Sequence, residues 1–208
     1  SHAMLTVNEI FHSIQGESTF AGAPCVFVRL TACDLRCTWC DTPYAFTEGA
    51  KRTIAEVVDE VLAFGCPLVE ITGGEPLLQD DVYPLMAALR ARGLTVLLET
   101  GGHISVARVP DGVVRIIDVK CPSSGESARN HWPNLDLLGP ADEVKFVIRD
   151  RADYEFARGV VARHGLAGRC AAVLFSPVHD VLPPPELASW ILADRLNVRL
   201  QLQVHKYI

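Results

Sequence analysis

The sequence predicts an α/β fold, an incomplete and splayed (β/α) barrel with mostly parallel strands. Two observations lead to this prediction. After residue 50, short apolar segments alternate with longer amphipathic segments, which is typical of βαβ units and a parallel sheet. Polar residues also fall at the carboxyl ends of the apolar segments, which is where such folds bind their ligands.

Each expected strand is a short run of apolar and β-branched residues bounded by turn-forming residues. The strand that precedes Gly73-Gly74, for example, reads Pro-Leu-Val-Glu-Ile-Thr. In chain order the expected strands are Val26–Leu30, Pro67–Thr72, Leu94–Thr100, Val113–Lys120, Glu143–Ile148, Ala171–Ser176 and Arg199–His205.

The expected helices place apolar residues three or four positions apart. In the first helix Ile54, Val57 and Val61 have this spacing, and Gly93 ends the second helix. The expected helices are Thr53–Phe64, Val82–Arg92, Arg151–His164 and Pro185–Leu192. The stretch Pro122–Pro140 is rich in proline, glycine and serine, and we expect a loop there instead of a helix.

Length and charge narrow the possible functions. The 208 residues suit one domain with a sizeable core, expected to span residues 4–208, and Ser1-His2-Ala3 resembles an expression scar. The net charge of −6 argues against a nucleic-acid partner and favours a small molecule. No apolar run reaches the length of a membrane span, and three of the seven cysteines are too close together for a secreted disulfide framework. We therefore expect a cytoplasmic protein.

Polar residues follow several of the expected strands. Cys33 follows the first strand, Gly73-Gly74-Glu75 the second and Glu99-Thr100 the third, while Asp118 and Lys120 close the fourth. Ser176 closes a later strand in the same way. Because the carboxyl ends of parallel strands meet at one edge of a sheet, these residues are expected to form one site.

Three cysteines lie within eight residues, Cys33, Cys37 and Cys40, with the spacing C-x3-C-x2-C. Clustered thiolates bind zinc, copper(I) or iron–sulfur clusters. Structural zinc sites normally have four protein ligands, so three cysteines favour a 4Fe–4S cluster with one open iron. A zinc site completed by His12 or Cys25 is the alternative.

The other four cysteines, Cys25, Cys66, Cys121 and Cys170, are isolated in the sequence. Isolated cysteines often behave as small buried hydrophobic residues. We expect these four to do so.

The cysteine loop, with its aromatic Trp39, resembles the motif of radical S-adenosylmethionine (SAM) enzymes. The segment Thr72–Pro76 resembles the GGEP segment that binds the SAM amino group there, although alone it would more often be an ordinary turn. The resemblance implies that the three cysteines bind the cluster and that SAM binds its open iron. It implies SAM contacts by Trp39, Asp41, Gly73, Gly74, Glu75, Thr100, Lys120, Ser124 and Ser176.

Within this superfamily the chain resembles the 7-carboxy-7-deazaguanine synthases. The match is dense over residues 9–45 and recurs at 72–76, at 118–124 and in the tail 203–206. Ser18 and Ala32 stand where glycines are expected. The resemblance implies a radical ring contraction, in which 6-carboxy-5,6,7,8-tetrahydropterin loses hydrogen from C6, rearranges and releases ammonia to give 7-carboxy-7-deazaguanine, a precursor of queuosine.

Residues beside the cysteine loop suit a pterin ring. Its N–H groups need acceptors, which Gln15 and Glu17 offer, while Gly16 permits close approach; a turn role for Glu17 is the alternative. Arg29 lies in an apolar strand and could bind a substrate carboxylate or form an internal salt bridge. The resemblance implies substrate contacts by Ile14, Gln15, Gly16, Glu17, Arg29, Thr72, His205 and the carboxylate of Ile208, unless the tail frays.

The resemblance also implies a magnesium ion bound by Thr42. One hydroxyl group binds Mg²⁺ weakly, so the substrate is expected to complete the site. An external electron donor of the flavodoxin or ferredoxin type and a homodimer are expected as well. Two rival interpretations remain open: a glycyl-radical activating enzyme, and a non-catalytic cluster or zinc module.

Overall fold

The computed structural model describes residues 3–32, 36–37 and 48–208. These residues form one sheet with the strand order β3-β1-β2-β4-β5-β6-β7-β8-β9. The strands are β1 (Met4–Ile14), β2 (Pro24–Leu30), β3 (Ala50–Thr53), β4 (Leu68–Gly73), β5 (Thr95–Thr100), β6 (Val114–Asp118), β7 (Glu143–Ile148), β8 (Ala172–Pro177) and β9 (Arg199–Leu200).

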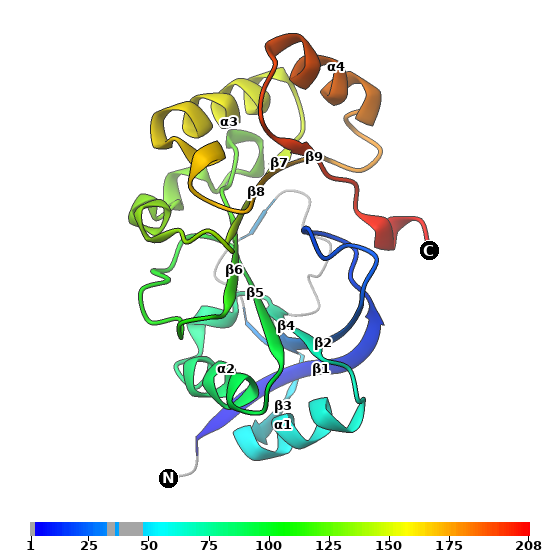
Figure 1. The fold of residues 1–208 in the computed structure, drawn as a ribbon, viewed down its shortest axis with the longest axis vertical. Coiled ribbons are helices and arrows are strands. Elements are labelled where there is room, and N and C mark those ends of the chain that lie inside the picture. The colour runs from blue at the N-terminus through cyan, green and yellow to red at the C-terminus, as the bar shows by residue number, and fades with distance from the viewer. Residues whose placement is uncertain (1–2, 33–35, 38–47) are drawn as a thin grey trace.

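The sheet is mostly parallel and does not close. From β2 to β9 every neighbouring pair is parallel, whereas β1 pairs antiparallel with both β2 and β3. In the described chain β3 and β9 form the two edges. The predicted incomplete (β/α) barrel is therefore confirmed, with an antiparallel hairpin added at its N-terminal side (Figure 1).

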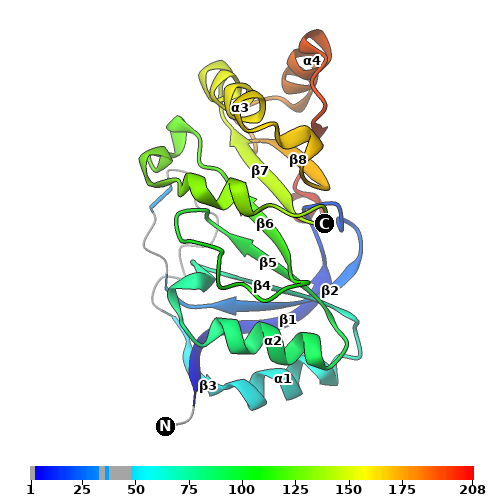
Figure 2. The same cartoon turned by 60° about the vertical axis from the view of Figure 1, so that its left-hand side comes forward.

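In the part of the chain that the structure describes, four α-helices lie along the outside of the sheet (Figure 1): α1 (Ile54–Ala63), α2 (Val82–Ala91), α3 (Arg151–His164) and α4 (Pro184–Asp194). Figure 2 shows α1 and α2 side by side below the β1–β5 part of the sheet. Thr53 caps α1 by accepting a hydrogen bond from Glu56 N, and Asp150 caps α3 in the same way from Asp153 N. Within the described chain no helix is both long and apolar enough to span a bilayer.

The structure departs from the sequence prediction in three places. Strands β1 and β3 at the N-terminal side were not expected, because β1 is only partly buried without strict alternation and β3 has only four residues. The last strand stops at Leu200, and Val204–Lys206 forms a 3₁₀ turn instead. The stretch Pro122–Pro140 contains three short 3₁₀ helices, so it is more regular than the expected loop.

The core consists of two apolar clusters between sheet and helices. The larger involves β1, β2, β4, β5, α1 and α2, and the smaller involves β7, β8, α3 and α4. Cys25, Cys66 and Cys121 are buried as predicted, whereas Cys170 is only half-buried. Burial raises the pKa of the Cys25 thiol, as expected of a structural cysteine.

Ser18 and Ala32 both adopt the left-handed backbone region, with φ of 66° and 82°. This explains why glycine suits both positions, because a Cβ atom destabilises that conformation. We predict that Ala32→Gly raises the free energy of unfolding by about 1 kcal/mol, measured by urea denaturation. Ala88→Gly in α2 is the matched control and should lower it by about 1 kcal/mol. A destabilised Ala32→Gly protein would contradict this account.

Candidate active site

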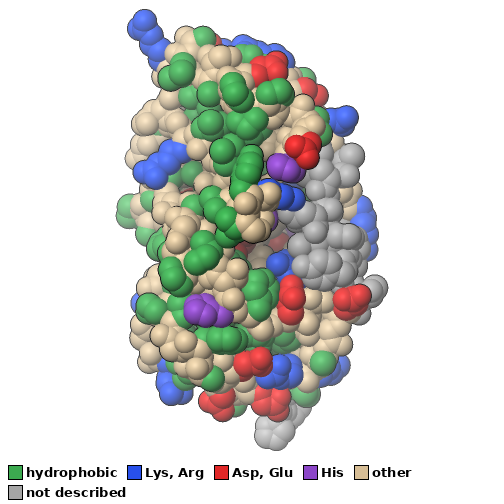
Figure 3. All heavy atoms as spheres, turned by 90° about the vertical axis from the view of Figure 1, so that its right-hand side faces the viewer, with side chains coloured by type: hydrophobic (Ala, Val, Ile, Leu, Met, Phe, Trp, Pro, Cys, Tyr) green, Lys and Arg blue, Asp and Glu red, His purple; other side chains and the backbone are tan. Residues whose placement is uncertain are grey.

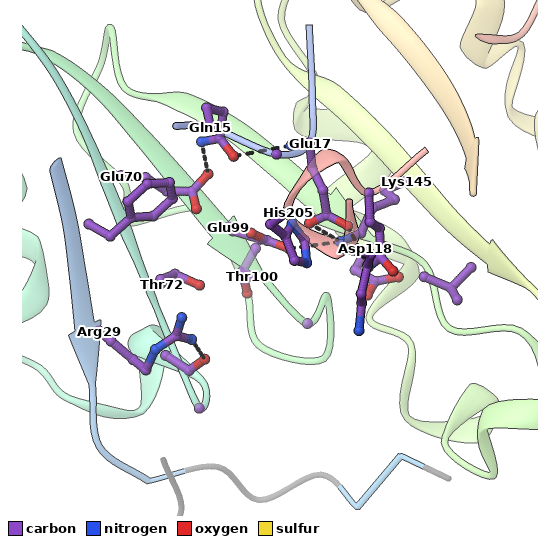
Figure 4. A pocket seen from close by; sticks show the side chains of 18 of the residues that line it. Gln15, Glu17, Arg29, Glu70, Thr72, Glu99, Thr100, Asp118, Lys145 and His205 are labelled. Carbon is purple, nitrogen blue, oxygen red and sulfur yellow. Dashed lines mark hydrogen bonds and ion pairs between the residues drawn. The ribbon is translucent and has the colours of Figure 1, made fainter. Parts of the chain in front are cut away.

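A cavity of about 610 Å³ lies at the carboxyl ends of the strands. Figure 4 shows side chains from the N-terminal hairpin, the central strands and the C-terminal tail facing it. Thirteen of the predicted site residues line it: Ile14, Gln15, Gly16, Glu17, Arg29, Cys37, Thr72, Gly73, Gly74, Glu75, Thr100, Lys120 and His205. The predictions for Cys33, Trp39, Cys40, Asp41 and Thr42 lie outside the described residues.

Three predicted contacts are not in the lining of this cavity. Ser124 is buried in a 3₁₀ turn, where its hydroxyl group donates to Cys121 O at 2.7 Å. Ser176 is also buried, in β8, and Ile208 is 78% exposed at the end of the tail. None of the three belongs to the cavity lining, so the expected contacts of Ser124 and Ser176 with SAM and of Ile208 with the substrate remain predictions.

The glycine turn after β4 packs against the chain that leads into the cysteine loop. A Cβ atom on Gly74 would lie 2.0 Å from Ala32 O, and Glu75 N donates to the same oxygen at 2.7 Å. A Cβ atom on Gly73 would likewise meet Leu30 O at 2.8 Å. The glycines therefore allow two backbone segments to approach each other, whereas sequence reasoning related them to a ligand.

Glu75 joins this turn to the end of β5. Its carboxylate is almost fully buried and accepts hydrogen bonds from Thr100 Oγ1 at 2.8 Å, Gly101 N at 2.7 Å and Leu77 N at 3.0 Å. Burial raises the pKa of Glu75, and these hydrogen bonds oppose the rise. Glu75 therefore stabilises the turn and also lines the cavity, where its carboxylate can pair with the ammonium group of a ligand.

Gln15 and Glu17 are held by a compact turn between β1 and β2. Gln15 N donates to Ala23 O at 2.8 Å, and Gly22 N returns a bond to Gln15 O at 2.7 Å. The Gln15 side-chain oxygen accepts from Glu17 N at 3.3 Å. The Glu17 carboxylate accepts from Gln203 Nε2 at 2.8 Å and pairs with Lys145 Nζ at 3.3 Å.

Gly16 makes room for the C-terminal tail. A Cβ atom at Gly16 would lie 2.3 Å from Nδ1 of His205, and Val204 N donates to Gly16 O at 2.9 Å. The close approach of the substrate ring that the sequence analysis expected at Gly16 remains a prediction, because Gly16 also lines the cavity. Gly16 brings His205 to the rim of the cavity.

We predict that Gly16→Ala displaces the tail and raises the KM for the substrate that the cavity binds, at a stability cost of about 1–3 kcal/mol because of the backbone contact. Steady-state kinetics and urea denaturation measure the two effects. Gly168→Ala is a matched control, since a Cβ atom there meets no atom within 4 Å. A Gly16→Ala enzyme with an unchanged KM would contradict the role of the tail.

Arg29 makes the internal salt bridge that the sequence left open. Its Nε lies 2.9 Å from Glu9 Oε1 on the neighbouring strand β1, and one terminal nitrogen donates to Gly73 O at 3.3 Å. The guanidinium group nevertheless lines the cavity. Glu9 therefore orients Arg29 beside the cavity, where it can also bind an anion.

Two charged residues that line the cavity were not predicted, Glu70 on β4 and Lys145 on β7, whereas Glu99 on β5 was expected at the end of its strand. Lys145 Nζ lies 2.7 Å from Glu99 Oε1 as well as 3.3 Å from Glu17 Oε2. Burial opposes the charge on Lys145, but the carboxylates of Glu17 and Glu99 raise its pKa well above the usual value. A charged residue within an otherwise apolar strand indicates a possible site residue. The sequence analysis applied this argument only to Arg29.

Lys120 and Asp118 form a second pair, with Nζ 2.6 Å from Oδ2. Burial opposes the charge on Lys120, but Asp118 and Cys37 raise its pKa. Among the described residues no group donates a hydrogen bond to the buried Oδ1 of Asp118. This acceptor and the Cys37 thiol border one cavity, so the described part of the site fits an iron–sulfur cluster and a hydrogen-bond-donating cofactor such as SAM.

Comparison with known proteins decides the family. The profile of the radical SAM superfamily matches residues 28–163. The chain is 51% identical to a 7-carboxy-7-deazaguanine synthase from Koribacter versatilis (strain Ellin345), covering 98% of this chain and 96% of that protein. It is 50% identical to one from Chlorobaculum tepidum, covering 100% and 96%. The chain belongs to the 7-carboxy-7-deazaguanine synthase family.

The family resemblance in the sequence is thereby confirmed, and the protein is a radical SAM enzyme. The fold has a solved counterpart in QueE from Escherichia coli, with a TM-score of 0.77 over 98% of this chain and 96% of that one. Sequence identity to that structure is 23%, so the comparison concerns the fold alone. Membership of the family implies a 4Fe–4S cluster and SAM as cofactors.

Proposed function

We propose that the protein converts 6-carboxy-5,6,7,8-tetrahydropterin into 7-carboxy-7-deazaguanine with loss of ammonia. The observation that supports this most strongly is a shared cavity. Gln15, Glu17 and Arg29 line the same space as Cys37 and the Gly73-Gly74 turn. Groups suited to a carboxylated pterin therefore adjoin the segment that bears the cysteines.

The side chains have complementary tasks in this proposal. Glu17 and the Gln15 carbonyl oxygen accept hydrogen bonds from the N–H groups of the ring, and Arg29 binds the substrate carboxylate. When bound, the cluster and SAM would supply the radical chemistry that removes hydrogen from C6 of the substrate. The conversion removes one ammonia with no net oxidation. The tasks of the protein's own side chains are to bind and orient the ring and to exclude water.

Magnesium and the electron donor belong to the proposal too. A substrate-bound Mg²⁺ near Thr42 would stabilise negative charge during the rearrangement. Removing Mg²⁺ with a chelator should lower the enzyme's activity, and adding Mg²⁺ back should restore it. The enzyme without substrate should bind Mg²⁺ only weakly. A flavodoxin- or ferredoxin-type protein is proposed to deliver the electron.

We also propose a cytoplasmic homodimer with no membrane or direct nucleic-acid partner. Several large hydrophobic side chains near the edge strand β9 are exposed, namely Val181, Leu192, Leu200, Leu202, Tyr207 and Ile208. Figure 3 shows hydrophobic side chains gathered on the face that includes the C-terminal segment. Contiguous apolar surface of this kind often marks a protein interface.

Anaerobic reconstitution tests the function. The enzyme with restored cluster, SAM and a strong reductant is incubated with 6-carboxytetrahydropterin, and the products are separated by mass. We expect a product lighter than the substrate by one ammonia. Reductive SAM cleavage without that product would reject the substrate assignment, whereas an absence of SAM cleavage would support a non-catalytic cluster module.

A further inference from the structure

Glu70 is a buried carboxyl group for which the mechanism above has no use. It lies in the middle of β4 between apolar neighbours, is 3% exposed and lines the same cavity as Gln15. Gln15 Nε2 donates a hydrogen bond to Glu70 Oε1 at 2.9 Å. A carboxyl group buried to this extent requires an explanation, because burying a charge is costly unless it is paired.

The charges around Glu70 favour its neutral form. The positive charge that acts on Glu70 is that of Lys145, which already contacts Glu17 and Glu99. An ionised Glu70 would be a third carboxylate beside one lysine. Burial and the carboxylates of Glu99 and Glu17 raise the pKa of Glu70 well above its usual value, although the Gln15 hydrogen bond and Lys145 oppose this.

Hydrogen-bond directions fix the Gln15 amide. The backbone N–H of Glu17 can only donate, so the atom of Gln15 that faces it must be the carbonyl oxygen. The amide nitrogen then faces Glu70, whose Oε1 must accept. Figure 4 shows Gln15 between these two partners, with the second oxygen of Glu70 turned away from it.

We propose that Glu70 is a positioning residue for substrate binding, which as a neutral carboxyl group holds the Gln15 amide so that its carbonyl oxygen faces the N–H donors of an aminopyrimidinone ring. This inference rests on the proposed function, because it takes the pterin as the substrate. Without the Glu70 acceptor, the amide nitrogen would lose its partner and the side chain could rotate away from the ring.

Glu70→Gln and Glu70→Met separate charge from hydrogen bonding. Glutamine keeps a neutral carbonyl acceptor in a side chain of the same shape, whereas methionine removes the acceptor at similar length. We expect the Kd for 6-carboxytetrahydropterin, measured by anaerobic calorimetry on the SAM-loaded but unreduced holoenzyme, to change less than about threefold in Glu70→Gln. In Glu70→Met it should rise about tenfold or more, since a buried donor is left unpaired. The affinity for SAM and the iron content should not change.

A double-mutant cycle tests whether Glu70 acts through Gln15. In a Gln15→Met background, adding Glu70→Met should weaken substrate binding no further. An additive loss would overturn the inference, as would wild-type affinity in Glu70→Met. A tenfold loss in Glu70→Gln would overturn it too, and this arm remains decisive if the methionine variant fails to fold.

The wild-type enzyme separates this inference from the proposed function. If the wild type cleaves SAM but neither binds nor converts the pterin, both proposals fail. If the wild type forms the deazaguanine product and Glu70→Met binds substrate normally, only the role of Glu70 fails.

Discussion

Replacing Lys145 with methionine is expected to lower the free energy of unfolding by about 3 kcal/mol, because it removes a buried ammonium group that two half-buried carboxylates share. Lys145 contacts Glu17 and Glu99 from a side chain that is 6% exposed. The two carboxylates come from the N-terminal turn and from β5, so one ammonium group joins distant parts of the chain. Urea denaturation of the apoprotein measures the effect.

Lys51→Met is the matched control, because Lys51 is exposed on the edge strand β3. Surface substitutions of this type usually change stability by less than about 0.5 kcal/mol. If the Lys145→Met and Lys51→Met proteins had equal free energies of unfolding, the contacts of Lys145 with Glu17 and Glu99 would not stabilise the fold.

The second large effect is expected for Cys37→Ala. This variant should lose the reconstituted cluster absorbance and should form 5′-deoxyadenosine only at the level of the unreconstituted protein, because each cluster thiolate holds one iron. Cys170→Ala is the control, since Cys170 is half-buried and is not part of the cavity lining. A Cys37→Ala enzyme that still cleaves SAM would exclude Cys37 from the cluster.

The parallel part of the fold follows from local sequence. Strands such as β4 and β7 are almost continuously buried, and their polar residues stand out among apolar neighbours, while the helices show clear apolar periodicity. The N-terminal hairpin did not show such a pattern. Strand β1 is half-exposed, and its partner β3 has only four residues, so pairing across the chain decides their conformation.

The site was predictable where chemistry depends on a short motif, and less so where it depends on tertiary contacts. Gln15, Arg29 and Cys37 were named from local sequence and line one cavity. The contact of Gly16 with His205 was not predicted, because the two residues lie far apart along the chain. Glu70 and Lys145 acquire their importance only when β4 and β7 bring them to the same cavity.

We propose that the cavity holds a carboxylated pterin with its C6 atom next to the site where the 5′-deoxyadenosyl radical would form. The most direct test uses 6-carboxytetrahydropterin with deuterium at C6, incubated anaerobically with the reconstituted enzyme, SAM and reductant. We predict that mass spectrometry finds the deuterium in 5′-deoxyadenosine while 7-carboxy-7-deazaguanine forms. Unlabelled 5′-deoxyadenosine, with no deazaguanine product, would contradict the account.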